Sequence, residues 1–245
     1  MSADPLSLRN LKFRRAVRHL SEVRRISEAY RSSNPYETLA KADLQPGAIA
    51  GVRILREPPT SISVSLGDAL QDLKSALDHA VYELARLSQA TPRQLEDSEF
   101  LITEDASWYA TNRKRRLGGV GPGALAFIDG LQPYLGVDDA HPHRGALRSI
   151  HQLARIDRHR HIHVARLAMG QPTLLATPLL GHEAPLAVSL SQVHVNVHIP
   201  IRIGINEPEL MGFVPLASVL DDIEARTGEI LVQLADFRPE KGWAS

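Results

Sequence analysis

Hydrophobic side chains recur every three or four positions in several long segments of the chain. This helical period is clearest over residues 8–32 and 67–89, and it also marks residues 144–160 and 216–237. Polar and charged side chains fill the other positions, as expected for helices that bury one face. The pattern therefore predicts four amphipathic helices, and a shorter helix near residues 123–131.

Extended patterns occupy two other parts of the chain. Residues 49–55 and 61–66 are short runs with β-branched or alternating apolar positions, and the Pro58-Pro59 pair between them disfavours helix. Further strand patterns lie in residues 161–167, 173–176, 186–190 and 193–205. The chain is therefore expected to combine long helices with short strands.

The predicted fold class is α+β. Amphipathic helices are expected to pack with a small, mostly antiparallel β portion at about residues 161–205, and short strands are expected near residues 49–66. A length of 245 residues suits one domain, residues 1–245. Within it, residues 161–210 could form a β subdomain.

The segment between the predicted helices is the least periodic part of the chain. Residues 92–122 are predicted to be irregular, with a short extended piece at residues 100–102. The run Arg113–Arg116, which precedes several glycines, lacks the Gly-Lys-Ser/Thr ending of a phosphate-binding loop. We interpret it as a basic surface loop.

The composition excludes several kinds of site. The chain has no cysteine, which rules out disulfides, thiolate metal sites, iron–sulfur clusters and cysteine nucleophiles. Its first residues lack the apolar run of a signal peptide, and no segment approaches the ~18 apolar residues of a membrane span. We therefore expect a soluble cytoplasmic protein with no membrane segment and no cofactor.

The overall charge is zero, but acidic and basic residues are segregated along the chain. Residues 9–31 hold eight basic and two acidic side chains, and residues 144–166 hold six and one. Residues 68–105 hold nine acidic and three basic side chains, and residues 205–245 hold eight and three. Oppositely charged segments could pack against each other, or the basic segments could form a surface that meets phosphate groups.

One face of the predicted helix 67–89 carries a histidine between two carboxylates. Asp72, His79 and Glu83 lie within about 60° of each other on a helix. Such a group could act in proton transfer or bind a metal, or it could be an ordinary solvated face. Lys74 and Asp78 are spaced for an ion pair elsewhere on the same helix.

The helix 144–160 ends with a carboxylate in an unusual place. Helical spacing puts Asp157 inside the apolar stripe, where an ionised group needs a partner, unless the helix ends before it and Asp157 caps a turn. His79 or the neighbouring His159 and Arg160 could supply that partner. We therefore expect a polar site where the two helices meet, formed by Asp78 and His79 from one and by Asp157, His159 and Arg160 from the other.

Histidines also alternate in the predicted strands. His159, His161 and His163 would share one strand face, and His194 and His198 would share another. Two such strands could bind zinc, iron or manganese. The same alternation is also what a half-exposed strand needs, so both interpretations stay open.

Two motifs together resemble a known family. They are the helix Gly67-Asp68-Ala69-Leu70-Gln71-Asp72-Leu73-Lys74-Ser75-Ala76-Leu77-Asp78-His79 and the later Asp157-Arg158-His159-Arg160. They resemble a widespread, largely uncharacterised family of bacterial and phage-associated proteins with a Gly-Asp…Leu-Arg-Ser-Ala-Leu-Asp-His helix and a later Asp-Lys-His-Arg motif. That family implies no established activity.

The helix also resembles the Arg-x(4–6)-His signature of HEPN proteins, a helical family with many metal-independent ribonucleases that act as dimers. Lys74 takes the arginine position and His79 the histidine position, with four residues between them. Lysine keeps the positive charge but lacks the planar group that grips phosphate with two hydrogen bonds. The resemblance implies RNA as a partner and a homodimer.

Three functional hypotheses follow. In a metal-independent ribonuclease, His79 would transfer protons while Lys74 and Arg160 stabilise the charge on phosphate. In a non-catalytic binding or structural protein, Asp78, His79, Asp157 and Arg160 would form a buried hydrogen-bonded network. The third hypothesis is a metal protein that uses the strand histidines.

Overall fold

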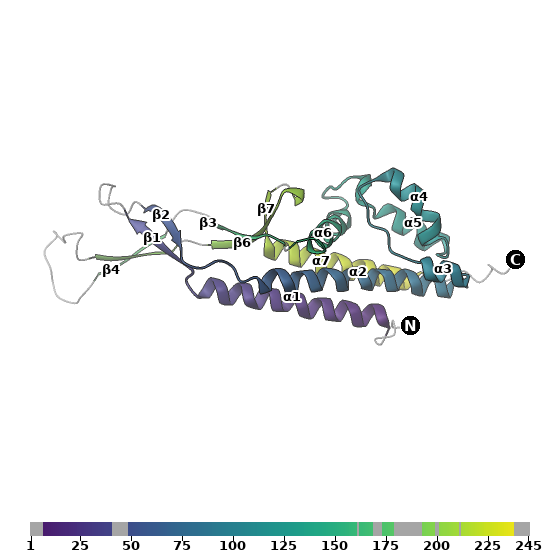
Figure 1. The fold of residues 1–245 in the computed structure, drawn as a ribbon, viewed down its shortest axis with the longest axis horizontal. Helices are drawn as coiled ribbons and strands as arrows, with labels where there is room; N and C mark the ends of the chain where they lie inside the picture. The colour runs from purple at the N-terminus through teal and green to yellow at the C-terminus, as the bar shows by residue number, and fades with distance from the viewer. Residues whose placement is uncertain are drawn as a thin grey trace.

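The computed structural model describes residues 7–40, 49–160, 162–168, 173–178, 193–198, 201–210 and 212–237. Its frame is a pair of long antiparallel helices, α1 (Leu8–Ser32) and α2 (Ser61–Leu87), which lie side by side (Figure 1). α7 (Leu216–Asp236) runs along the same pair, and α6 (Pro142–Asp157) packs on α2 and α7. All four helices predicted from the long helical pattern are confirmed; α2 begins at Ser61, well before the predicted residue 67, and the ends of the other three differ little or not at all.

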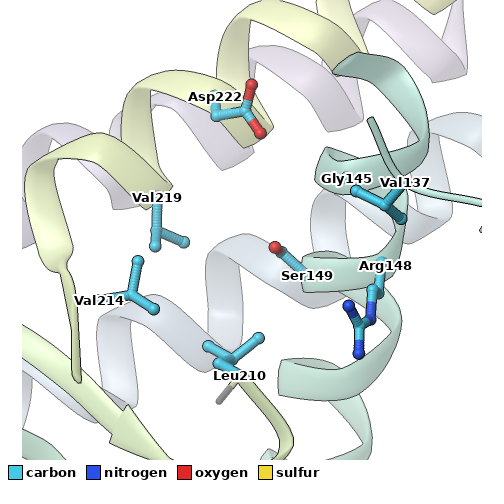
Figure 2. Close-up of a pocket in the computed structure, with 8 residues that line it drawn as sticks. All are labelled: Val137, Gly145, Arg148, Ser149, Leu210, Val214, Val219 and Asp222. Carbon is cyan, nitrogen blue, oxygen red and sulfur yellow. The ribbon is translucent and has the colours of Figure 1, made fainter. Parts of the chain in front are cut away.

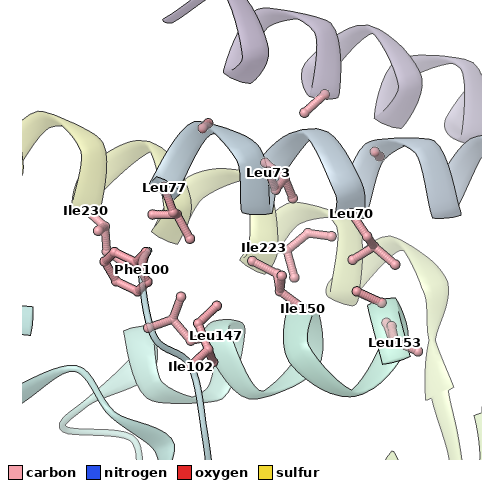
Figure 3. Packing of buried hydrophobic residues seen from close by; sticks show 14 of the residues in the cluster. Leu70, Leu73, Leu77, Phe100, Ile102, Leu147, Ile150, Leu153, Ile223 and Ile230 are labelled. Carbon is pink, nitrogen blue, oxygen red and sulfur yellow. The ribbon is translucent and has the colours of Figure 1, made fainter. Parts of the chain in front are cut away.

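The hydrophobic core lies where α2, α6 and α7 meet (Figure 3). α2 contributes Leu70, Leu73 and Leu77, which are fully buried against side chains of the other two helices. These include Leu147 and Ile150 of α6 and Ile223 and Ile230 of α7. Burying a side chain of this size stabilises the fold by about 1.5–3 kcal/mol, so these residues contribute substantially to holding the three helices together.

The described strands form three separate antiparallel sheets. β1 (Tyr36–Ala40) pairs with β2 (Ile49–Ile54), and β4 (Thr173–Pro178) pairs with β5 (Val193–His198). β6 (Ile201–Glu207) lies between β3 (Val164–Ala168) and β7 (Gly212–Pro215). The fold is thus α+β, as predicted. The extended pattern over residues 193–205 forms two strands rather than one, and residues 186–190 lie outside the described part of the chain.

The predicted strand at residues 61–66 is wrong, because this segment is the first part of α2. Ile62 and Leu66 are fully buried, whereas Val64 between them is half exposed. A spacing of four residues fits both a strand and a helix, so the short alternating run is ambiguous. Burial of Ile62 and Leu66 on the same stripe as Leu70 decides for the helix.

Residues 92–122, predicted to be irregular, contain two complete helices and the start of a third. These are α3 (Pro92–Asp97), α4 (Ala106–Leu117) and α5 (Pro122–Gly130). Thr91 caps α3 through a reciprocal hydrogen-bonded pair with Gln94, and Asp105 caps α4. The cap residues therefore mark the starts of these helices, although the hydrophobic pattern does not.

Two smaller predictions in this region are also corrected. Arg113–Arg116 lie on the last turns of α4 and not in a loop. Residues 100–102 are buried, but the structure assigns them to no strand. Two short 3-10 helices complete the described elements, at Pro133–Leu135 and Pro208–Leu210.

Candidate functional site

The segregated charges of the sequence meet between the helices. Asp72 of α2 is 1% exposed and accepts two hydrogen bonds from Arg15 of α1, at 2.5 and 2.6 Å. Arg9 of α1 pairs with Glu83 of α2 at 3.2 Å. Arg24 of α1 contacts Asp221 and Glu224 of α7, both at 2.8 Å. The prediction that oppositely charged segments pack together is therefore confirmed for α1.

This packing changes the meaning of the predicted face with Asp72, His79 and Glu83. Both carboxylates are engaged by cations of α1, so they join two helices instead of flanking a free histidine. His79 is half-buried on the same helix. Among the described residues there is no group of three or more side chains suited to hold a metal ion. The face is a helix–helix contact.

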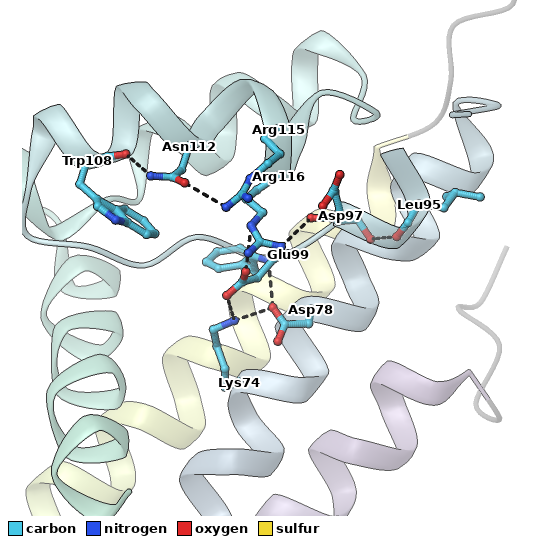
Figure 4. Close-up of polar contacts among 11 residues, drawn as sticks. Lys74, Asp78, Leu95, Asp97, Glu99, Trp108, Asn112, Arg115 and Arg116 are labelled. Atoms are coloured by element: carbon cyan, nitrogen blue, oxygen red, sulfur yellow. Dashed lines mark hydrogen bonds and ion pairs between the residues drawn. The ribbon is translucent and has the colours of Figure 1, made fainter. Parts of the chain in front are cut away.

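Lys74 and Asp78 belong to a second polar network (Figure 4). The Lys74 ammonium lies 2.6 Å from the Asp78 carboxylate and 3.4 Å from Glu99, and Glu99 pairs with Arg116 of α4 at 3.3 Å. The Asp78 carboxylate also accepts a hydrogen bond from the backbone N–H of Phe100 at 2.9 Å. Burial raises the pKa of Asp78, and the ammonium of Lys74 opposes this shift. The network fastens the segment before α4 to α2.

The expected meeting of His79 with Asp157 does not occur. Asp157 lies against Gly67, where a methyl group built on the glycine would come within 2.3 Å of a carboxylate oxygen. Twelve residues separate Gly67 from His79, which is a rise of about 18 Å along an α-helix. The end of α6 crosses α2 near its start, so Asp78 and His79 lie well beyond the crossing.

Arg160 and His159 are also placed away from His79. The guanidinium of Arg160 binds Glu207 of β6 through both terminal nitrogens, at 3.0 and 2.8 Å. Glu207 is 1% exposed and accepts a third hydrogen bond from the backbone N–H of His163 at 2.6 Å. His159 is exposed in the turn that follows α6. Arg160 thus connects this turn to the sheet.

The strand interpretation of the first histidine group is wrong, since β3 begins only at Val164. His159 precedes it in a turn, and His163 is exposed, with its ring 3.3 Å from the carbonyl oxygen of Asn206. His161 lies outside the described residues. His194 and His198 lie on β5, for which the structure describes the backbone alone. The metal hypothesis for these residues stays a prediction.

A cavity that the sequence did not indicate lies between α2, α4 and α6. We call it the Trp108 cavity; its volume is about 220 Å³. Lys74 and Gln71 of α2, Trp108 of α4, and His151 and Arg158 of α6 line it. His151 and Arg158 are seven residues apart and therefore share one face of α6, which is the signal that could have found them.

The surroundings of His151 in this cavity favour its neutral form. Burial lowers the pKa of His151; the carboxylate of Glu104 opposes this effect, whereas Arg155, Arg158 and Lys74 strengthen it. The imidazole is therefore uncharged at neutral pH and can accept a proton.

The lowered pKa of His151 predicts a pH-dependent stability. The unfolded chain takes up the proton near the ordinary pKa of 6.5, and the folded chain only at lower pH. The contribution of His151 to the free energy of unfolding should thus be fully present above about pH 6.5 and decrease as the pH falls below it. Urea unfolding followed by circular dichroism should show a smaller loss between about pH 7.5 and pH 5.5 for His151→Gln than for the unmodified protein. His159→Gln, which alters an exposed side chain, should behave like the unmodified protein, and an equal pH response of His151→Gln would contradict this account.

A second cavity, which we call the Ser149 cavity, lies between α6, α7 and β7 (Figure 2). Its volume is about 210 Å³. Apolar side chains from β7 and α7 form one wall, and Ser149 and Gly145 of α6 lie across from them. The two cavities lie on different sides of α6 and share no lining residue.

Comparisons with known proteins identify no relative. No protein-family model, no curated protein and no solved structure matches the chain. None of the helices in the described part of the chain has the length and apolar character needed to span a membrane. Any functional assignment therefore rests on the residues and their geometry.

Proposed function

We propose that this chain is a cytoplasmic protein that binds single-stranded RNA in the Trp108 cavity. The observation that carries the proposal is the gathering of an aromatic ring, cationic side chains and a histidine around one cavity, from three different helices. Single-stranded RNA offers both a negative backbone and unstacked bases, so its binding sites combine cations with aromatic rings.

Each side chain has a part in this proposal. Trp108 is 46% exposed, which leaves part of the residue open to a base that stacks on its ring. Arg158, the residue after α6, is exposed; its Nε donates to the carbonyl oxygen of Ala154, and its terminal nitrogens can bind a phosphate group. Lys74 adds positive charge, although Asp78 and Glu99 share it. Gln71 supplies an amide that can hydrogen-bond a base edge or a ribose hydroxyl.

The proposal keeps Lys74 from the HEPN resemblance but gives the role of His79 to His151. A neutral, half-buried imidazole beside cations is suited to remove the proton from a ribose 2′-hydroxyl. The 2′-oxygen would then attack phosphorus to form a 2′,3′-cyclic phosphate as the bond to the 5′-oxygen breaks, and the released 5′-oxygen would take a proton from water, so no metal is required. The homodimer implied by the same resemblance stays a prediction, which a molar mass from light scattering would check.

Binding is tested with a fluorescently labelled single-stranded RNA of about a dozen nucleotides. Trp108→Ala should raise Kd about tenfold, because a stacked base contributes about 1–3 kcal/mol. Arg158→Gln should weaken binding and reduce the dependence of log Kd on log salt by about 0.7. The control is Arg93→Gln on α3, a side chain that is 76% exposed and does not line the cavity. Equal Kd values for all four proteins would overturn the proposal.

Cleavage is measured by incubating the unmodified protein and the His151→Gln variant with the RNA and excess EDTA, and by resolving the RNA on a gel. We expect His151→Gln to abolish cleavage while Kd changes less than about threefold, because the substitution removes a proton acceptor and no positive charge. Cleavage that persists in His151→Gln, or that requires a divalent metal, would remove the catalytic step and leave the binding proposal to stand on Kd alone.

A second candidate function is a non-catalytic scaffold. It is favoured by the hydrogen bonds of Asp78 and Glu207, which tie a loop to α2 and a turn to the sheet. If the chain is a scaffold, substitutions in those networks change stability only, and neither the unmodified protein nor any variant binds RNA.

A further inference from the structure

The Ser149 cavity is amphipathic and carries one weakly neutralised charge. Val214 and Val219 form its apolar wall with Leu210, and the Ser149 hydroxyl points toward its centre in Figure 2. Asp222 of α7 lies above that centre. An apolar wall with few polar groups is the usual composition of a small-molecule site.

The second charged residue of the lining, Arg148, already has a partner. Its Nε lies 2.8 Å from the Glu104 carboxylate, which in turn accepts a hydrogen bond from Gln152 at 2.6 Å. This pair leaves little net charge at that end of the cavity. An anionic ligand would have to compete with Glu104 for Arg148.

Asp222 is less well neutralised. Arg226 approaches it at 3.6 Å, but the same guanidinium donates to both carboxylate oxygens of Glu229 at 2.9 Å. His143 contacts Glu229 at 2.9 Å, and its side chain also acts electrostatically on Asp222. Burial raises the pKa of Asp222, and Arg226 and His143 oppose this shift. Because Asp222 shares these neighbours with Glu229, a cation in the cavity would add a counter-charge.

We propose that the Ser149 cavity binds a small organic cation, a primary amine with a compact branched aliphatic body. The ammonium group would donate hydrogen bonds to the Asp222 carboxylate and to the Ser149 hydroxyl. Its aliphatic body would cover Val214, Val219 and Leu210. A volume of about 210 Å³ accommodates a ligand of this size.

Isothermal titration calorimetry tests the proposal with three probes of similar shape, namely isoamylamine, isoamyl alcohol and isovalerate. The amine should bind at least tenfold more tightly than the alcohol or the carboxylate, because only the ammonium pairs with Asp222. No detectable heat for the amine at 10 mM, or equal affinities of amine and alcohol, would overturn the proposal.

Variants locate the site. Asp222→Asn should reduce amine affinity to that of the alcohol, and Ser149→Ala should reduce it several-fold. Asp221→Asn is the matched control, because Asp221 is the neighbouring acid of α7, pairs with Arg24 and does not line the cavity. Circular dichroism confirms that each variant is folded. Amine binding that survives Asp222→Asn, or that Asp221→Asn removes to the same extent, would contradict the assignment.

Discussion

Replacing Gly67 with alanine should lower the free energy of unfolding by up to about 2 kcal/mol, although alanine is normally the better helix former. The new methyl group would lie 2.3 to 2.5 Å from three atoms of the Asp157 carboxyl group, which must turn away to make room. This rearrangement costs about 1–3 kcal/mol, and the higher helix propensity of alanine returns about 1 kcal/mol. Urea unfolding at neutral pH, followed by circular dichroism, measures the difference.

The matched control is Gly130→Ala at the end of α5. A methyl group at Gly130 meets nothing within 4 Å, so this variant should be as stable as the unmodified protein or gain up to about 1 kcal/mol. Adding Asp157→Ala to Gly67→Ala should remove the clash and show a coupling of at least about 1 kcal/mol. Equal stabilities of Gly67→Ala and Gly130→Ala would mean that the position of the Asp157 carboxyl group does not depend on the space left by Gly67.

Replacing Glu207 with alanine should lower the free energy of unfolding by about 3 kcal/mol. The substitution removes the carboxylate that binds the guanidinium of Arg160 and accepts the backbone N–H of His163. Breaking a buried ion pair costs about 3–5 kcal/mol; the lower end applies because the Arg160 side chain is 49% exposed. The same unfolding assay measures the effect.

An exposed acid provides the comparison. Glu96 of α3 is 71% exposed and lies 3.7 Å from Arg93, so Glu96→Ala should cost less than about 0.5 kcal/mol. Glu207→Ala should leave the Kd for single-stranded RNA unchanged once folding is complete, because Glu207 does not line the Trp108 cavity. A loss below about 1 kcal/mol would show that the turn after α6 does not depend on Glu207.

Most of the helical frame could be predicted because each long helix carries its own periodic stripe. Leu70, Leu73 and Leu77 are buried on one side of α2 as their spacing requires. Short elements were harder to predict. Residues 61–66 fit two periods at once, and α3 and α4 are marked by their caps, Thr91 and Asp105, more than by a stripe.

The contacts of the candidate site were harder to predict than the helices. Lys74 and Asp78 pair as their spacing predicts, because four residues on a helix fix the distance between side chains. The expected contact of His79 with Asp157 depended instead on where α6 crosses α2. A crossing point follows from how two apolar surfaces interlock, including the space left by Gly67, and no spacing within one helix reports it.

The α+β class, the long amphipathic helices and the presence of opposite charges that could pair can all be deduced from the order of residues. These properties are local or compositional. The packed structure was needed to show that Asp72 is covered by Arg15, that Arg160 binds Glu207, and that His151 shares a cavity with Trp108. Such contacts join residues far apart in the chain, and they arise when whole helices pack to bury their apolar faces.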